Sequence, residues 1–456
     1  MNIKKFVLML TCLAVFLNLF LISPLADNES NVSGDFEYSV CPDTASEEYR
    51  GTIEITRYLG TDYEVVIPAE IDGKKVTLIG DYLFYKNENL KSVKLPDTII
   101  SIGTEAFSLC KSLETVNIPS GVKEIGGAFR SCEKLTSIVI PEGVEYIYFD
   151  TFKDCTSLKN VQLPNGLKMI YDFAFENCSS LTEISIPDSV EELGTGVFAG
   201  CTSLQSIVIP ENVSYIGKGI FTGSAVYKDA KNWSDGTLYI NNCILDSKRE
   251  EISGEFSIPD GTRVVAKSAF LGAENLESLK LPASVKSICD SAFADCTSLK
   301  YVELSDGIET IGDGAFKACS MESIVVPEGV KTIGENAFQN GKLKRVTLPK
   351  SLEAIGDCAF DGNSIYTIRY NGTEAEWNEK QLGKSLTISP YATMFFGEDE
   401  SNSDVPSETD DASQNELESS NVENNDKDSG NTITIIVIAI FVVAVAVLVV
   451  CLKRKK

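Results

Sequence analysis

One aromatic side chain recurs through the middle of this chain at an almost constant interval. The steps between its members are 22 or 23 residues, except for one of 49 residues between Phe221 and Phe270. A regular period of this length is typical of chains whose successive segments stack as the coils of a solenoid. The members are Phe84, Phe107, Phe129, Phe152, Phe175, Phe198, Phe221, Phe270, Phe293, Phe316, Phe338 and Phe360.

Each period repeats one pattern, of which IGTEAFSLCKSLETVNIPSGVKE is a representative example. The alternation of apolar residues in Leu113–Ile118 predicts one short strand per coil, with Val116 and Ile118 pointing inward. Pro119 lacks an amide hydrogen and ends that strand, and Gly103 allows the chain to turn. We therefore predict a mainly β solenoid of short parallel strands, with one short strand or turn per coil and little helix except a terminal membrane helix.

With this repeat pattern the sequence resembles the BspA-type leucine-rich-repeat proteins of bacterial surfaces. The resemblance covers residues 36–396 and includes the irregular parts. Residues 36–80 resemble the first strands and cap of that family, residues 225–270 resemble its hairpin insertion, and YNGTEAEWNEKQLG resembles its terminal repeat. The resemblance implies a leucine-rich-repeat solenoid that binds host matrix proteins, other cells or glycans. Wall-anchored relatives carry an LPxTG motif, which is missing here, so that the membrane helix is expected to anchor the chain.

The two ends of the sequence predict export and membrane anchoring. Lys4 and Lys5 precede an apolar run, which is the pattern of a signal peptide that ends at Ala26, although Pro24 leaves an uncleaved anchor as the alternative. The apolar run Ile433–Leu452 is long enough to span a bilayer, and four basic residues follow it. Because basic residues stay on the cytoplasmic side, the rest of the chain is expected outside the cell.

These patterns together predict a division of the chain into nine segments. Residues 397–431 are acidic and contain few apolar residues, so that they are expected to form a disordered stalk. The segments are 1–26, a signal peptide; 35–80, an N-terminal β cap; 81–222, repeats; 223–257, a hairpin-like insertion; 258–371, repeats; 372–396, a C-terminal cap; 397–431, the stalk; 432–452, a transmembrane helix; and 453–456, a cytoplasmic tail.

The cysteines follow the repeat as well. The chain has 13, an odd number, and in an exported protein disulfides would be the ordinary interpretation. Seven of them lie three residues after a repeat Phe, and we predict that they stack as buried free thiols, because a small apolar side chain suits that position. They are Cys110, Cys132, Cys155, Cys178, Cys201, Cys296 and Cys319. Cys41, Cys243, Cys289 and Cys358 have no assignment from the sequence.

Composition removes several classes of function. The net charge of -26 argues against nucleic-acid binding, which needs a basic surface. Histidine is absent, which excludes Ser-His-Asp and Cys-His catalysis and any His-ligated metal. There is also no Cys-x-x-Cys motif, and we predict no metal, no cofactor and no enzymatic activity. The adjacent acidic pairs Glu47–Glu48 and Glu250–Glu251 leave carboxylate-based glycan cleavage as a remote alternative, because a glycosidase needs two carboxyls facing across a cleft.

The most distinctive outward side chains of the predicted strands are Tyr301, Glu303, Arg345 and Arg369, which we take as candidate ligand-binding residues. Trp233 in the insertion is a further candidate, with packing of the insertion as the alternative. The resulting hypothesis is a membrane-anchored cell-surface protein that binds an extracellular protein or glycan, as in adhesion. The alternative is an envelope spacer that has no dedicated ligand.

Overall fold

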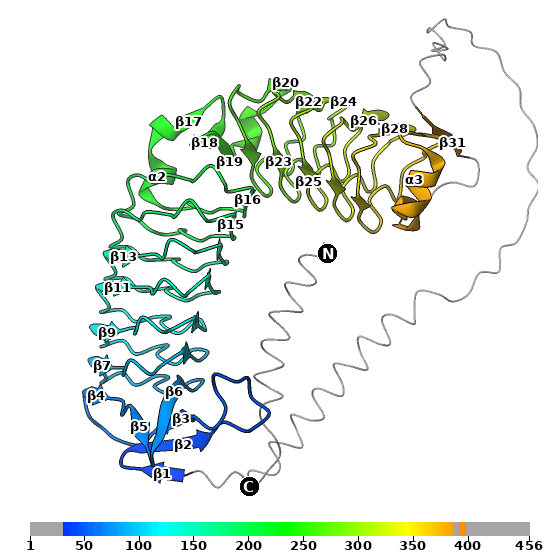
Figure 1. The fold of residues 1–456 in the computed structure, drawn as a ribbon. Coiled ribbons are helices and arrows are strands. Elements are labelled where there is room, and N and C mark those ends of the chain that lie inside the picture. Colours follow the sequence, from blue (N-terminus) through cyan, green and yellow to red (C-terminus); the bar gives the residue numbers. More distant parts are fainter. Residues whose placement is uncertain (1–30, 386–391, 398–456) are drawn as a thin grey trace, which may run out of the picture. The chain divides into compact units, whose positions relative to one another are not determined.

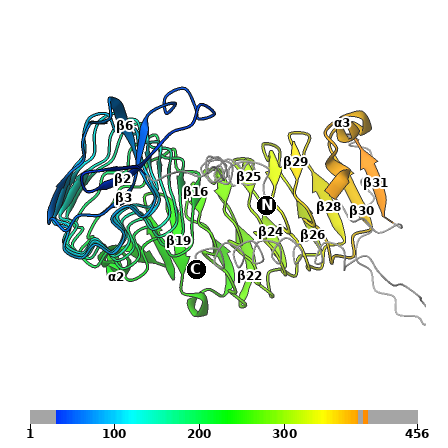
Figure 2. The ribbon, with the colours of Figure 1, turned by 90° about the horizontal axis from the view of Figure 1, so that it is seen from below.

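The computed structural model describes residues 31–385 and 392–397. They form a parallel β-solenoid whose coils stack through two ladders of short strands (Figures 1 and 2). The ladder of strands that precede the repeat Pro is called the Pro-side ladder here, and the ladder that precedes the repeat Gly is called the Gly-side ladder. The prediction of a single strand per coil was wrong, because the second strand contains only two residues in most coils and is too short to show an alternating pattern.

The Pro-side ladder pairs its strands in parallel and in register, for example Val93 with Val116 and Ile324 with Val346. It is interrupted between β9 and β11, which pair with other neighbours. Its strands are β4 (Glu64–Val66), β7 (Ser92–Lys94), β9 (Thr115–Asn117), β11 (Ser137–Val139), β13 (Asn160–Gln162), β20 (Gly254–Ser257), β22 (Leu276–Lys280), β24 (Tyr301–Glu303), β26 (Ser323–Val325), β28 (Arg345–Leu348), β30 (Thr367–Tyr370) and β31 (Thr393–Phe396).

The Gly-side ladder places one buried aliphatic residue per coil next to its equivalent in the next coil, as with Ile288 and Ile311. Its strands are β6 (Lys74–Ile79), β8 (Ser101–Ile102), β10 (Glu124–Ile125), β12 (Tyr146–Ile147), β14 (Met169–Ile170), β15 (Glu192–Leu193), β16 (Tyr215–Ile216), β21 (Val264–Val265), β23 (Ser287–Ile288), β25 (Thr310–Ile311), β27 (Thr332–Ile333) and β29 (Ala354–Ile355).

A turn containing the repeat Phe connects each Gly-side strand to the rest of its coil. The residues two before and two after every repeat Phe have positive φ angles, as at Glu105 and Leu109 around Phe107. Between them, amide groups donate to the next coil, as in Phe107 N to the Ala128 carbonyl at 2.9 Å. The turn therefore stacks from coil to coil by backbone hydrogen bonds of its own, without forming a strand.

The repeat Phe rings form two continuous stacks. Ring centroids of neighbouring coils lie 5.0 to 5.7 Å apart from Phe84 to Phe221 and again from Phe270 to Phe360. We call the coils of the first stack the N-terminal array and those of the second the C-terminal array. The prediction that one Phe per coil fills the interior is confirmed, since Phe107 to Phe338 have at most 1% exposure.

The seven stacked cysteines have the structural role that the sequence predicted, with one addition. Each is buried, and its Sγ lies within hydrogen-bond distance of a repeat Phe carbonyl in the preceding coil, as in Cys110 to Phe84 at 3.0 Å and Cys296 to Phe270 at 3.3 Å. In the last coil, Asn363 takes the thiol's place and its amide donates to the Phe338 carbonyl at 2.7 Å. Burial raises the pKa of Cys110, Cys155, Cys201 and Cys296 to about 12, so that these thiols stay protonated at neutral pH.

Irregular elements begin, interrupt and end the solenoid. Before the coils lie β1 (Asn31–Ser33), β2 (Phe36–Val40), β3 (Ile53–Tyr58) and β5 (Glu70–Ile71). Between the arrays lie α2 (Ala225–Lys228), η1 (Ala230–Asn232), β17 (Trp233–Ser234), β18 (Thr237–Ile240), β19 (Cys243–Ser247) and η2 (Arg249–Glu251). After the coils come α3 (Glu374–Glu379) and η3 (Leu382–Ser385), which lie near β31 at the end of the C-terminal array (Figure 2).

The insertion is tied to both arrays. β17, β18 and β19 pair antiparallel, and β19 then pairs in parallel with β21, so that the insertion opens the C-terminal array. The Arg263 guanidinium donates to the carbonyls of Glu211 and Val213 at 2.8 Å each and to Pro210 at 2.6 Å, in the last coil of the N-terminal array. Tyr215 also donates to Asp290 at 2.9 Å.

Several predicted segments fall outside the described residues: the signal peptide 1–26, the tail 453–456, the span 432–452 and nearly all of the stalk. Within residues 31–385 and 392–397, no helix has the length and apolar character that a bilayer span requires.

Candidate functional site

Four of the candidate residues lie on one side of the Pro-side ladder of the C-terminal array. Tyr301 and Glu303 are in β24, Arg345 is in β28 and Arg369 is in β30. Their side chains point outward because they alternate with inward residues such as Val346 and Ile368, which are 2% exposed. We call the outward surface of β24, β26, β28, β30 and β31 the β24–β31 face.

The first half of this face carries Tyr301, whose side chain is 71% exposed. β22 and β24 pair so that Lys280 lies beside Glu303, and their side chains form an ion pair at 3.3 Å. This pair is exposed to solvent and contributes little to stability. Tyr301 therefore remains an exposed aromatic side chain on a surface whose nearest charges are balanced.

The second half of the face combines arginines with aromatic rings. Arg345 Nη1 donates to the Tyr366 hydroxyl at 3.2 Å, and the Arg369 guanidinium lies 5.8 Å from the centre of the Phe395 ring. Tyr366 is 46% exposed and Phe395 is 41% exposed. The structure thus places an arginine next to an exposed aromatic side chain at two points.

The structure does not gather the four predicted residues into one cluster. β26 lies between β24 and β28, and its outward Val325 is 64% exposed. β24 and β26 are in different sheets, so that the ladder is interrupted between the two halves. Val325 is in the outward column that the sequence predicts but is not among the candidates, and neither are Tyr366 and Phe395. Following the outward column of the strands one coil further would have found Phe395, whereas Tyr366 lies just before a strand and has no signal in the alternation.

Trp233 is placed in β17, in a different sheet from the β24–β31 face. Its ring packs edge-on against Tyr227 at 5.3 Å, and its indole NH donates to the Tyr227 carbonyl at 2.7 Å. The ammonium group of Lys248 lies 5.2 Å from the ring centre. These contacts favour the alternative interpretation, in which Trp233 packs the insertion.

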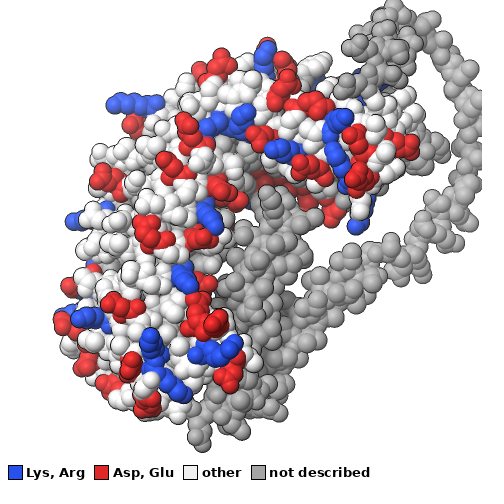
Figure 3. Space-filling model, viewed as in Figure 1, with Lys and Arg blue, Asp and Glu red and all other residues white. Residues whose placement is uncertain are grey.

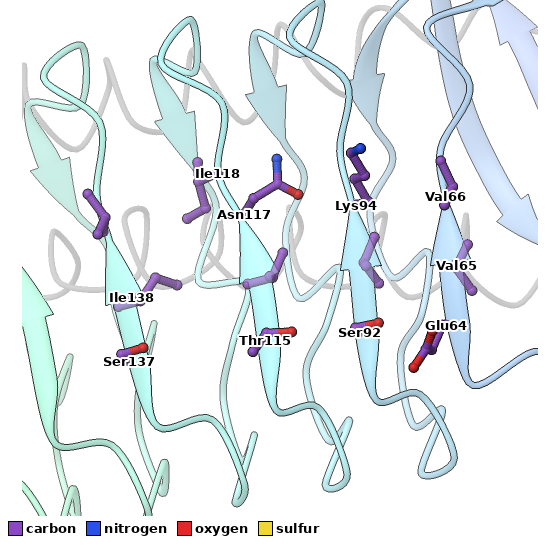
Figure 4. Close-up of a pocket in the computed structure, with 13 residues that line it drawn as sticks. Glu64, Val65, Val66, Ser92, Lys94, Thr115, Asn117, Ile118, Ser137 and Ile138 are labelled. Atoms are coloured by element: carbon purple, nitrogen blue, oxygen red, sulfur yellow. The ribbon is translucent and has the colours of Figure 1, made fainter.

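An open groove lies on the Pro-side ladder of the N-terminal array, where β9 and β11 are not paired (Figure 4). It has a volume of about 670 Å³, and Val116 and Ile118 are only partly buried there. The groove contains one carboxylate, Glu64, and one amine, Lys94. It therefore lacks the two facing carboxyl groups that glycan cleavage needs.

The acidic pair Glu250–Glu251 lies in the short helix η2 and is exposed, and Glu251 forms an ion pair with Lys248 at 3.2 Å. Among the residues that the structure describes, no group of three or more Cys, Asp or Glu side chains is arranged to hold a metal ion. Acidic and basic side chains are interspersed over the visible face in Figure 3, with no large basic patch of the kind that nucleic acid requires.

Comparisons with known proteins agree with the coil pattern. The model of the BspA type leucine rich repeat region matches in six copies, over residues 77–128, 126–247 and 263–387. A comparison with curated proteins finds no match. Among solved structures, a leucine rich cell surface protein from Faecalibacterium prausnitzii is 27% identical, with 78% of this chain and 97% of that chain covered and a TM-score of 0.35.

Two further solved structures are similar in sequence. A leucine-rich repeat protein from Bacteroides ovatus is 23% identical, with 80% and 99% of the two chains covered and a TM-score of 0.38. The pneumococcal vaccine antigen PcpA is 20% identical, with 80% and 93% covered and a TM-score of 0.34. Because the family model matches more than half of its residues, this chain belongs to the BspA-type leucine-rich-repeat family.

Proposed function

We propose that this protein is a cell-surface adhesion protein that binds an extracellular protein through the β24–β31 face. The observation that carries the proposal is the set of exposed aromatic side chains on that face and the arginines beside them, Tyr301, Arg345, Tyr366, Arg369 and Phe395. Tyrosine and arginine dominate the binding energy of protein interfaces, whereas the solvated face of a solenoid has no need of them.

The contacts within the face support binding in a second way. Arg345 is held by the Tyr366 hydroxyl, and Arg369 lies over Phe395, so that both arginines are partly ordered before a partner arrives. Side chains that are ordered in advance lose less conformational entropy on association. At about 4.8 Å per strand, the five strands of the face extend over roughly 20 Å, which is enough for a cluster of anchoring contacts.

Surface display is the second part of the proposal. It is supported by the sequence of Ile433–Leu452 and of the four basic residues that follow, together with the acidic segment before them. The segment 397–431 would hold the solenoid away from the membrane. Removing residues 432–456 is expected to release the protein into the medium, and retention of the truncated chain in the membrane fraction would contradict the anchor.

The binding test uses the full chain displayed on cells and an array of purified matrix and cell-surface proteins. At least one protein is expected to bind, and replacing both Arg345 and Arg369 by Ala should weaken this binding about tenfold or more. Ser278→Ala, on the neighbouring strand β22, is the matched control. An array without any binding protein would favour the envelope spacer, and binding that survives the double substitution would place the partner elsewhere.

A further inference from the structure

A second group of aromatic side chains lies on the opposite ladder of the N-terminal array. Tyr148 and Tyr171 stack with their ring centres 5.6 Å apart, and Phe149 lies 4.8 Å from Tyr171. The ring centre of Tyr146 lies 6.4 Å from that of Tyr171. Together with Phe173, these residues come from two adjacent coils, those of Phe152 and Phe175, and we call them the aromatic cluster.

The solenoid itself does not require this cluster. Tyr148 and Tyr171 occupy the position at which most coils have Gly, as at Gly103 and Gly194. A Cβ atom at Gly194 would lie only 2.5 Å from the amide nitrogen of Asp172 in the preceding coil, so that a side chain at this position forces a local adjustment. Two successive coils nevertheless carry the bulkiest kind of side chain here.

Phe173 departs from the repeat in its side chain. The φ angle at this position is positive in every coil, +59° at Phe173, but most coils have Gly, Ser, Asn or Asp here. Its side chain is 36% exposed and that of Phe149 is 53% exposed, so that neither ring is needed to fill the interior.

The charged groups around the cluster neutralise one another. Lys153 forms ion pairs with Asp150 at 3.6 Å and with Glu176 at 2.7 Å, and Lys168 pairs with Glu145 at 2.8 Å. The ammonium group of Lys153 also lies 5.1 Å from the centre of the Phe173 ring, and so already occupies the position that a cationic ligand would take. In a chain with a net charge of -26, these balanced ion pairs around the cluster favour a ligand without charge.

We propose that the aromatic cluster is a binding platform for a neutral saccharide. A sugar ring has one face of C–H groups, which packs on an aromatic ring, and a rim of hydroxyl groups, which hydrogen-bond to carboxylates such as those of Asp150 and Glu145. The exposed ring of Phe149 and the part of Phe173 that Lys153 leaves exposed provide the apolar surface, and the balanced ion pairs provide the polar rim. This site is separate from the β24–β31 face and does not depend on it.

The test uses affinity electrophoresis of the full chain in detergent, with dextran, mannan or galactan in the gel. At least one of these neutral polysaccharides is expected to retard the wild-type protein. The double variant Phe149→Ala and Phe173→Gly should lower the apparent affinity about tenfold or more. Gly already stands at the position of Phe173 in several coils, with the same positive φ angle, so that Phe173→Gly is expected to keep the turn.

Phe395→Ala is the matched control, because it removes an exposed ring from the β24–β31 face and should leave the retardation unchanged. The proposal is overturned if none of the three polysaccharides retards the protein, if heparin retards it as strongly as they do, or if the double variant behaves like the wild type. It is also overturned if the double variant loses a bound protein on the array rather than a polysaccharide. If this proposal fails, the binding test with the Arg345 and Arg369 substitutions on the β24–β31 face is not affected.

Discussion

The N-terminal and C-terminal arrays share an interior and differ at the surface. Both have a continuous stack of Phe rings with nearly parallel planes. The N-terminal array has five stacked thiols against two in the C-terminal array, and most of its exposed aromatic residues, such as Phe149 and Phe173, lie beside the Gly-side ladder. In the C-terminal array they lie on the Pro-side ladder. The interior of the coil is thus constrained by stacking, whereas each surface position varies independently.

The largest expected difference between the two arrays is in their stability at alkaline pH. Burial in the folded protein raises the pKa of the stacked thiols above 9.0, to about 12 for Cys155, so that the protonated form is favoured by folding. The resulting stability is complete below pH 9 and is lost as the pH rises toward 12, by about 1.4 kcal/mol per thiol and pH unit. With five thiols, the N-terminal array should unfold first.

Hydrogen exchange measured along the chain between pH 8 and pH 11, with reductant present, checks this order. Replacing the five N-terminal thiols by Ala, which the coil accepts at Ala273, should reverse this order, because Cys296 and Cys319 remain in the C-terminal array. Equal loss of protection in both arrays of the unmodified protein would contradict the assignment of the effect to the thiols.

Removing one ring from either Phe stack should lower the free energy of unfolding by the same amount. Phe175 lies between rings at 5.2 and 5.6 Å, and Phe316 lies between rings at 5.3 and 5.5 Å. Replacement of either by Ala leaves a cavity and should lower the free energy of unfolding by about 3–5 kcal/mol. Denaturant titration of the two variants measures this, with Phe→Leu at each position as the milder control. A clear inequality between them would show that the two interiors are not equivalent.

The junction between the arrays rests on Arg263, whose guanidinium donates to carbonyls of the coil that ends the N-terminal array. Arg263→Ala should lower the free energy of unfolding by about 2–3 kcal/mol. It should also split one unfolding transition into two, one for each array. Arg263→Lys should not restore cooperativity, because an ammonium group cannot bridge the same set of carbonyls. A single transition in both variants would mean that other contacts couple the arrays.

The smallest effect is expected at the end of the C-terminal array. Thr373 caps α3, and its hydroxyl accepts from the Glu376 amide at 3.2 Å while the Glu376 carboxylate accepts from the Thr373 amide at 2.8 Å. Thr373→Ala should destabilise the last coil by about 1 kcal/mol, with Thr373→Ser as the control. Hydrogen exchange is expected to increase near α3 and to stay unchanged in the N-terminal array.

The coil register and the interior of this protein could be predicted from its sequence alone. Each depends on residues that recur at one fixed interval, so that the stacked Phe rings and thiols follow once the coils are known to superimpose. The outward direction of Tyr301 and Arg345 follows from alternation within a strand, which is also a local property.

Only the tertiary structure decided the second ladder, the junction and the aromatic cluster. A two-residue strand such as Ser287–Ile288 gives no periodic signal and forms because neighbouring coils supply its partners. Arg263 donates to four carbonyls that lie 50 to 54 residues away in the sequence, a separation that no repeat of 22 or 23 residues specifies. The aromatic cluster forms where two coils have aromatic residues in place of the usual ones, and only the stacking of the coils brings these aromatic residues together.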